Sequence, residues 1–170
     1  GAGGSAISMG YHLMQEKYRG NFPAKIVIAN RSQPRLTEIK EIFKTLDPGG
    51  IEFEYYLTPD EGQNDEVLAM MKPGSIIINA TGLGKDRPGS PLTDDAKFPE
   101  KSLIWEINYR GDLRFMHQGL EQKQEGNLHV EDGWRYFIYG WTSVISEVFH
   151  IPIVGKELAK CDEVASGFRA

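Results

Sequence analysis

The chain begins with a glycine-rich stretch, GAGGSA, whose spacing suits the binding of a diphosphate. Gly1, Gly3 and Ala6 match the dinucleotide fingerprint G-x-G-x-x-G/A. Its first glycine permits a tight turn, its second lets phosphates approach bare backbone, and its small third residue allows close helix packing. A helix that starts at Ser5 offers unpaired N–H groups to the same phosphates. The stretch predicts cofactor contacts for Gly1, Ala2, Gly3, Gly4, Ser5 and Ala6; a glycine-rich turn that binds nothing is the alternative interpretation.

A second stretch, NRSQPR, indicates which dinucleotide is bound. Proteins that bind NAD usually place Asp or Glu at this point, where it accepts a hydrogen bond from the ribose 2′-hydroxyl. Here Asn30 is followed by Arg31 and Ser32, with Arg35 one helical turn further on. Two guanidinium groups can bind a 2′-phosphate, and a serine hydroxyl can add a hydrogen bond. These four residues therefore predict NADP as the cofactor, whereas a solvated helix start is the alternative.

A third stretch, SIIINATG, follows the pattern of a buried parallel strand that ends in a polar loop. Open α/β sheets bind their ligands outside the carboxyl ends of the strands. We therefore expect Asn79, Ala80, Thr81 and Gly82 to contact the cofactor. For the charged residues 85–87 that follow, a solvent-exposed loop is an equally good interpretation.

The spacing of apolar residues predicts the elements that hold these stretches. Helices are expected at 5–18, 34–46, 64–73, about 112–124, 133–151 and 156–168, and strands at 24–30, 51–57, 75–81, 102–109 and 127–131. This alternation indicates right-handed βαβ units in a Rossmann-type α/β fold, with a doubly wound, mostly parallel sheet. That sheet has a central strand before the glycine loop. We therefore expect the first strand to be missing and residues 1–170 to be one NADP-binding domain from a larger protein.

Composition narrows the class of protein. The 170 residues are 40% hydrophobic and 25% charged, as in one globular domain, and a net charge of −5 argues against nucleic acid as a partner. The apolar runs are too short to span a membrane. The single cysteine, Cys161, excludes an internal disulfide and fits a cytoplasmic protein. The four histidines are scattered without ligand spacing, so no metal site is expected.

Five stretches in order resemble the C-terminal, NADP-binding domain of the shikimate/quinate dehydrogenase family. They are GAGGSA, NRSQPR, NATGLG, WEINY and DGWRYFIYGW, and they span about residues 1–150. The resemblance implies that Ile107 lies beside the nicotinamide and that Tyr109 contacts the substrate. It also implies that the helix led by Gly133, with Tyr136, closes over the nicotinamide.

The chain also departs from the pattern of that family. Tyr136 and Phe137 replace the usual Met-Leu, and Gly140 stands where a glutamine normally contacts the substrate hydroxyls. Arg110 belongs to a segment, NYRGDLRFMHQG, that replaces the usual Tyr-x-Pro. Its guanidinium group could bind a substrate carboxylate, and a surface ion pair with Asp112 is an equally good interpretation. These changes indicate a divergent member and leave the substrate open between shikimate, quinate and another polyhydroxy or carboxylated ring.

The resemblance implies reversible hydride transfer between NADP and a secondary alcohol on that ring. The Lys and Asp that handle the proton in the family lie upstream of the glycine loop, so no catalytic residue is assigned here. The expected partners are a small-molecule substrate and the missing N-terminal substrate domain, and the oligomeric state is open. The alternatives are a non-catalytic NADP-binding or sensing module and another two-domain NADP enzyme, such as the glutamyl-tRNA reductase or a folate-linked methylene dehydrogenase.

Overall fold

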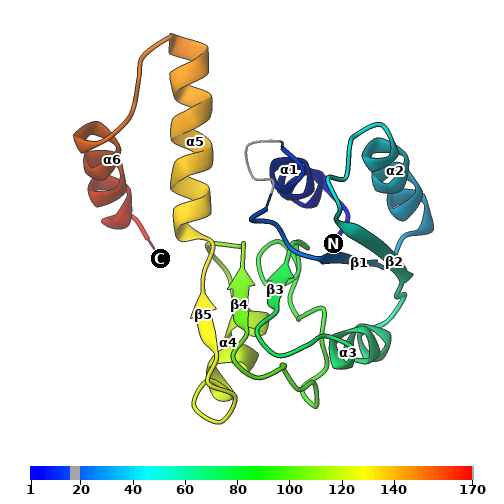
Figure 1. The fold of residues 1–170 in the computed structure, drawn as a ribbon. Coiled ribbons are helices and arrows are strands. Elements are labelled where there is room, and N and C mark those ends of the chain that lie inside the picture. Colours follow the sequence, from blue (N-terminus) through cyan, green and yellow to red (C-terminus); the bar gives the residue numbers. More distant parts are fainter. Residues whose placement is uncertain (16–19, 170) are drawn as a thin grey trace.

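Helices and strands alternate along most of the chain in the computed structural model, which describes residues 1–15 and 20–169 (Figure 1). The helices are α1 (Gly4–Leu13), α2 (Gln33–Lys44), α3 (Glu61–Ala69), α4 (Arg114–Glu121), α5 (Trp134–Phe149) and α6 (Lys156–Ser166). The strands are β1 (Lys25–Asn30), β2 (Glu52–Leu57), β3 (Ile76–Asn79), β4 (Leu103–Glu106) and β5 (His129–Glu131). The mixed α/β class predicted from the sequence is confirmed.

The strands form two small parallel sheets instead of the one sheet expected. β1 pairs with β2 along its whole length, from Lys25 opposite Glu52 to Asn30 opposite Leu57. β3, β4 and β5 form the second sheet in that order, with Ile76 opposite Leu103 and Leu103 opposite His129. Among the residues that the structure describes, β1 and β3 do not pair with each other, so each ends its sheet.

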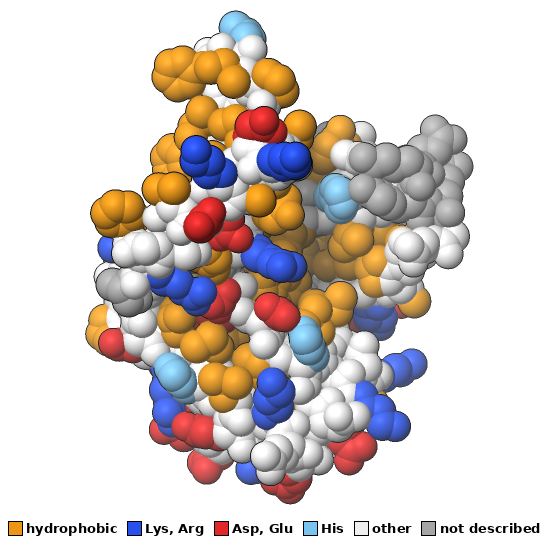
Figure 2. All heavy atoms as spheres, turned by 90° about the vertical axis from the view of Figure 1, so that its left-hand side faces the viewer, with side chains coloured by type: hydrophobic (Ala, Val, Ile, Leu, Met, Phe, Trp, Pro, Cys, Tyr) orange, Lys and Arg blue, Asp and Glu red, His pale blue; other side chains and the backbone are white. Residues whose placement is uncertain are grey.

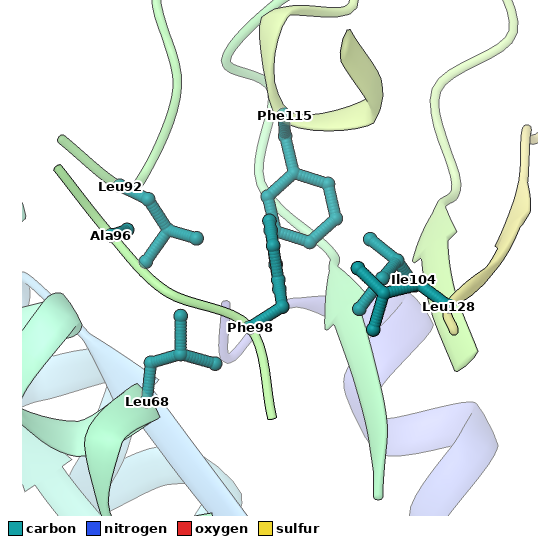
Figure 3. Close-up of a cluster of buried hydrophobic side chains, with 7 residues drawn as sticks. All are labelled: Leu68, Leu92, Ala96, Phe98, Ile104, Phe115 and Leu128. Carbon is teal, nitrogen blue, oxygen red and sulfur yellow. The ribbon is translucent and has the colours of Figure 1, made fainter. Parts of the chain in front are cut away.

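Each sheet has its own hydrophobic core. Helices α1 and α2 cover the first sheet, with Ala2, Ile28, Leu36, Ile39 and Phe43 buried between them. In the second core (Figure 3), the rings of Phe98 and Phe115 meet edge to face, with centroids 5.6 Å apart. Their neighbours are Leu68, Leu92, Ala96, Ile104 and Leu128. The buried aliphatic and aromatic side chains thus form two separate cores, one for each sheet.

Several element boundaries differ from the prediction, each for a local reason. Helix α1 ends at Leu13, short of the predicted 5–18, and the predicted end at Tyr18 lies outside the described residues. Helix α3 starts before residue 64 because the Asp60 side chain accepts a 3.0 Å hydrogen bond from the Gln63 N–H. Strand β3 ends at Asn79, before residue 81, because the Asn79 side chain accepts the Thr81 N–H and turns the chain.

Helix α5 extends beyond the end of the second sheet, and α6 lies beside it (Figure 1). The indole N–H of Trp134 donates a 2.8 Å hydrogen bond to Asp162 and so joins the two helices. Figure 2 shows the side of the molecule that carries α5 and α6, and hydrophobic side chains gather at its top. The large hydrophobic side chains exposed on α5 are Tyr136, Tyr139, Trp141, Val144, Ile145, Val148 and Phe149. None of the described helices has the length and apolar character needed to cross a membrane.

Candidate functional site

Gly1 contacts the carboxyl ends of both sheets. Its backbone nitrogen donates a 2.9 Å hydrogen bond to the carbonyl of Ala29 in β1. A Cβ atom on Gly1 would lie 2.3 Å from the carbonyl oxygen of Ala80, just after β3. Only glycine therefore fits between these two strand ends. The contacts bring the glycine turn beside two of the other predicted cofactor segments.

The next two glycines leave the start of α1 uncovered. Gly3 is the N-cap of the helix and makes no side-chain capping bond. No atom lies within 4 Å of the position that a Cβ would take on Gly3 or Gly4. Packing within the chain does not require glycine at these two positions, and the open space leaves the first N–H groups of α1 accessible. This arrangement fits a diphosphate bound at a helix N-terminus.

Helix α5 reaches back to the same turn. The Tyr136 hydroxyl donates a 3.0 Å hydrogen bond to the hydroxyl of Ser5, which is 131 positions away in the sequence. The Tyr136 ring also packs edge to face on Trp105 in β4, with centroids 6.0 Å apart. The structure thus places a predicted phosphate-loop residue and a predicted nicotinamide-side residue in direct contact.

The turn after β1 leads directly into α2. Asn30 accepts the Ser32 N–H at 2.8 Å, and Ser32 is the N-cap of α2 without using its own side chain to cap the helix. Arg31 is exposed at this turn. Arg35 pairs with Glu38 on the same helix at 2.9 Å, a partner that the sequence interpretation did not include. Because the pair is solvent-exposed, it stabilises the chain little and a bound phosphate could displace it.

Asn79 supports the loop after β3 from inside. It is 1% exposed, and its Oδ1 accepts hydrogen bonds from the backbone N–H and the hydroxyl of Thr81, at 3.0 and 2.7 Å. Its Nδ2 donates to Glu106 at 2.6 Å and to the Leu83 carbonyl at 3.3 Å. The polar atoms of Asn79 are therefore engaged within the protein. Of the predicted contacts in this loop, Gly82 is exposed and Thr81 is half-buried.

Sequence reasoning missed Glu106, at the end of β4. The side chain is completely buried, and it accepts hydrogen bonds from Asn79 and from the Asn108 N–H. Burial raises the pKa of this carboxyl from 4.5 to about 7, although both hydrogen bonds and the charge of Lys85 lower it. A carboxylate within the apolar run SLIWEINY was the available signal, because an acidic residue inside a buried strand needs a specific partner.

Tyr109 lies among charged side chains. Its ring stacks on Phe137 of α5 with centroids 4.0 Å apart, and the cations of Lys85 and Arg110 lie 5.9 and 6.0 Å from its centre. Each of these cations is 3.4 Å from Asp86. Beside them is an open hollow lined by Gly84, Lys85, Asp86, Arg87, Pro88, Gly111 and Asp112. A polar ligand in this hollow would therefore meet both positively charged groups, Lys85 and Arg110, and a negatively charged one, Asp86.

Two predicted glycines differ in their surroundings. A Cβ on Gly133 would lie 2.0 Å from the carbonyl oxygen of Ile107, which is itself buried, and the Gly133 N–H donates to Asn108 at 3.1 Å. Gly133 therefore has a packing role at the junction of β4 and α5. Gly140 lies on the exposed side of α5, with no atom within 4 Å of a Cβ position. The structure does not bring Gly140 into the cluster around Tyr109.

Within residues 1–15 and 20–169, no group of three or more His, Cys, Asp or Glu side chains is arranged to hold a metal ion. The donors in these segments are backbone N–H groups, amides, hydroxyls and the cations of Lys85 and Arg110, which suit an anionic organic ligand, and Glu106 and Asp86 add carboxylates beside them. No protein-family model, curated protein or solved structure matches the chain.

Proposed function

We propose that this chain is the NADP-binding part of an oxidoreductase of the shikimate/quinate dehydrogenase type. The observation that carries the proposal is the position of Gly1, which touches Ala29 at the end of β1 and Ala80 at the end of β3. Three segments expected to bind the cofactor, beginning at Gly1, Asn30 and Asn79, therefore meet at the start of α1. Ligands of α/β proteins bind at such a meeting of strand ends.

The two sheets are, in this proposal, the two halves of one doubly wound sheet. The edges of β1 and β3 each lack a neighbour within the described residues, and the carboxyl ends of both strands flank Gly1. Most side chains of both strands remain partly exposed, and Ile76 is 61% exposed. One further parallel strand between β1 and β3 would pair both edges and complete the order expected of the fold.

The choice of NADP rests on the turn after β1. Arg31 is exposed there, and the Ser32 hydroxyl makes no capping bond. The adenosine 2′-phosphate would accept hydrogen bonds from Arg31 and Arg35, and the diphosphate would occupy the uncovered backbone of Gly3 and Gly4. When bound, NADP supplies or accepts the hydride of the reaction, while these residues bind and orient it.

The substrate side lies around Tyr109 in this proposal. Lys85 and Arg110 offer positive charge beside the Tyr109 ring, which suits a carboxylated ring substrate. The stacked contact with Phe137 fixes the plane of the tyrosine and leaves its hydroxyl for a hydrogen bond. An N-terminal substrate domain would supply the proton-handling side chains.

A titration of NADPH and NADH against wild type and Arg31→Ala tests the cofactor assignment. We expect the variant to bind NADPH more than tenfold more weakly and NADH almost unchanged, because a hydrogen bond between charged groups is lost. Lys72→Ala is the control, since it removes a positive charge just before β3, at the opposite end of the sheet. The readout is the dissociation constant from nicotinamide fluorescence.

Equal losses for both cofactors in Arg31→Ala would refute the 2′-phosphate contact. Failure of the wild-type chain to bind either cofactor, with its fold intact by circular dichroism, would refute the proposed function. A tenfold loss of NADPH affinity in Lys72→Ala would show that overall charge, and not the Arg31 contact, controls binding.

A further inference from the structure

The buried carboxyl of Glu106 joins two loops. Its Oε2 accepts a 2.6 Å hydrogen bond from the side-chain amide of Asn79, at the end of β3. Its Oε1 accepts a 2.8 Å bond from the backbone N–H of Asn108, just beyond β4. The side chain has no exposed surface. Glu106 therefore connects the segment after β3 to the segment after β4 at the edge where the candidate site lies.

The donors around Glu106 cannot reverse their roles. A backbone N–H, such as that of Asn108, can only donate. The amide of Asn79 is oriented by the backbone N–H of Thr81, which must face Oδ1 and so directs Nδ2 toward Glu106. Both carboxyl oxygens must accept in this arrangement. Only the ionised form accepts at both oxygens with full strength, since a protonated carboxyl turns one oxygen into a donor.

The same network fixes the loop after β3. Asn108 donates from Nδ2 to the carbonyls of Thr81 and Leu83, at 3.2 and 3.1 Å, and Asn79 donates to Leu83 as well. Leu83 in turn donates its N–H to the Thr81 hydroxyl at 3.2 Å. The backbone from Thr81 to Leu83 is therefore held by the two asparagines that bind Glu106.

We propose that Glu106 is a positioning residue, whose ionised carboxylate holds Asn79 and Asn108 and thereby keeps the Thr81–Leu83 loop in the conformation that binds the cofactor. Protonation of Glu106 breaks one of its two hydrogen bonds and loosens this loop. The cofactor part rests on the proposed function, whereas the effect on the loop does not.

Burial, and not a neighbouring charge, places the protonation of Glu106 near neutral pH. Burial raises the pKa of the carboxyl to about 7, and the charge of Lys85 lowers it. Lys85 comes from the loop after β3, and it is 3.4 Å from Asp86. The groups that face Glu106 from β3 and from beyond β4, Asn79 and Asn108, are uncharged. The carboxylate thus depends on hydrogen bonds more than on a counter-ion.

Amide hydrogen exchange on the chain alone tests the positioning role. The protection factors of Thr81, Leu83 and Asn108 are compared at pH 8 and pH 6 in wild type, Glu106→Gln and the control Glu66→Gln, an exposed position on α3. In wild type and in the control, protection should fall about tenfold at pH 6 because one bond is lost. In Glu106→Gln it should be low at both pH values, because the new amide presents an N–H to a donor.

Wild-type protection in Glu106→Gln at pH 8 would overturn the proposal. A second variant, Lys85→Met, keeps the proposal testable if Glu106→Gln does not fold. Lys85 is only partly buried, and loss of its charge should move the midpoint of the wild-type exchange transition to higher pH. A midpoint that does not move, or that moves to lower pH, would contradict the charge dependence.

A parallel titration with NADP⁺ separates this inference from the proposed function. The ratio of dissociation constants for Glu106→Gln and wild type should be about ten or more at pH 8 and approach one at pH 6. Because both proteins meet the same ligand, titration of the NADP⁺ phosphates cancels in the ratio. A ratio of one at both pH values would refute the effect on the cofactor. Absence of NADP⁺ binding to wild type would refute the proposed function, and the exchange data would still decide the role of Glu106.

Discussion

Replacing Gly133 by alanine should destabilise the chain, whereas the same replacement at Gly140 in the same helix should stabilise it. Gly133 has a negative φ of −88°, so backbone conformation does not require glycine there. The difference arises from the surroundings of each residue. A methyl group on Gly133 meets the backbone of Ile107 and Asn108, whereas one on Gly140 meets no atom within 4 Å.

The magnitude follows from the distance between the new methyl group and the carbonyl oxygen of Ile107. That distance is 2.0 Å, and ordinary contact begins at 3.4 Å, so the end of β4 and the start of α5 must separate by about 1.4 Å. Overpacking of this kind costs about 1–3 kcal/mol, at the upper end where backbone must move. Alanine is also a poorer N-cap than glycine. We expect a loss of about 3 kcal/mol for Gly133→Ala.

Gly140→Ala should raise the free energy of unfolding by about 1 kcal/mol, because alanine has the higher helix propensity and the position is exposed. Urea unfolding followed by tryptophan fluorescence and by far-ultraviolet circular dichroism measures both variants against wild type. Agreement of the two probes and an unchanged slope would show that the midpoints report stability. A Gly133→Ala variant as stable as wild type, or equal losses in both variants, would refute the packing argument.

Two further predictions concern buried polar groups. Thr58→Val should stabilise the chain by about 1 kcal/mol, because the Thr58 hydroxyl is buried and has no hydrogen-bond partner among the described residues. Thr142→Val, in the same unfolding assay, is the control, since the Thr142 hydroxyl donates to Ile138 at 2.7 Å and its loss should not stabilise. The contribution of Glu106 to the free energy of unfolding should fall by at most about 3 kcal/mol between pH 4.5 and pH 7, and Glu106→Gln should lack this slope.

The sign of the pH effect follows from proton binding. The folded carboxyl has the higher pKa, about 7 against 4.5, so within this window the folded chain binds more protons than the unfolded chain. Stability against complete unfolding from this group is therefore largest at low pH and is lost as the pH rises through 7. The loosening of the loop has the opposite pH dependence, because there the carboxyl stays buried and loses only a hydrogen bond that lowers its pKa. Wild type and Glu106→Gln are compared at each pH by urea unfolding, so that titration of other groups cancels. A difference that grows in the opposite direction, or none, would contradict the prediction.

The type and order of the elements were predictable because they depend on local patterns. Apolar spacing around Leu36, Ile39 and Phe43 predicts α2, and the β-branched run before Asn30 predicts β1, both as found. The ends of helices and strands were less predictable where a side chain hydrogen-bonds to the backbone in place of the regular backbone partner. Asp60 starts α3 early, and Asn79 ends β3 early, through single hydrogen bonds that apolar spacing does not reveal.

The candidate site also has a part that the sequence predicts and a part that it does not. GAGGSA places glycines before a helix, so sequence alone predicts an uncovered helix N-terminus, and the structure has one. The partner of Ser5 lies 131 positions away, and the partner of Glu106 in β3 lies 27 positions away. Such contacts depend on which strands lie side by side and in which register.

The alternation of strands and helices and the glycine turn follow from the sequence, since these features need only neighbouring residues. Three features became visible only in the fold: the strands divide into two sheets, Gly133 is required by close packing, and a buried carboxylate joins the loops after β3 and β4. The physical reason is that close approach and burial are properties of distant segments brought together. A local sequence pattern does not predict how far two distant segments exclude water from a side chain. Nor does it predict which hydrogen-bond donors will surround a buried carboxylate.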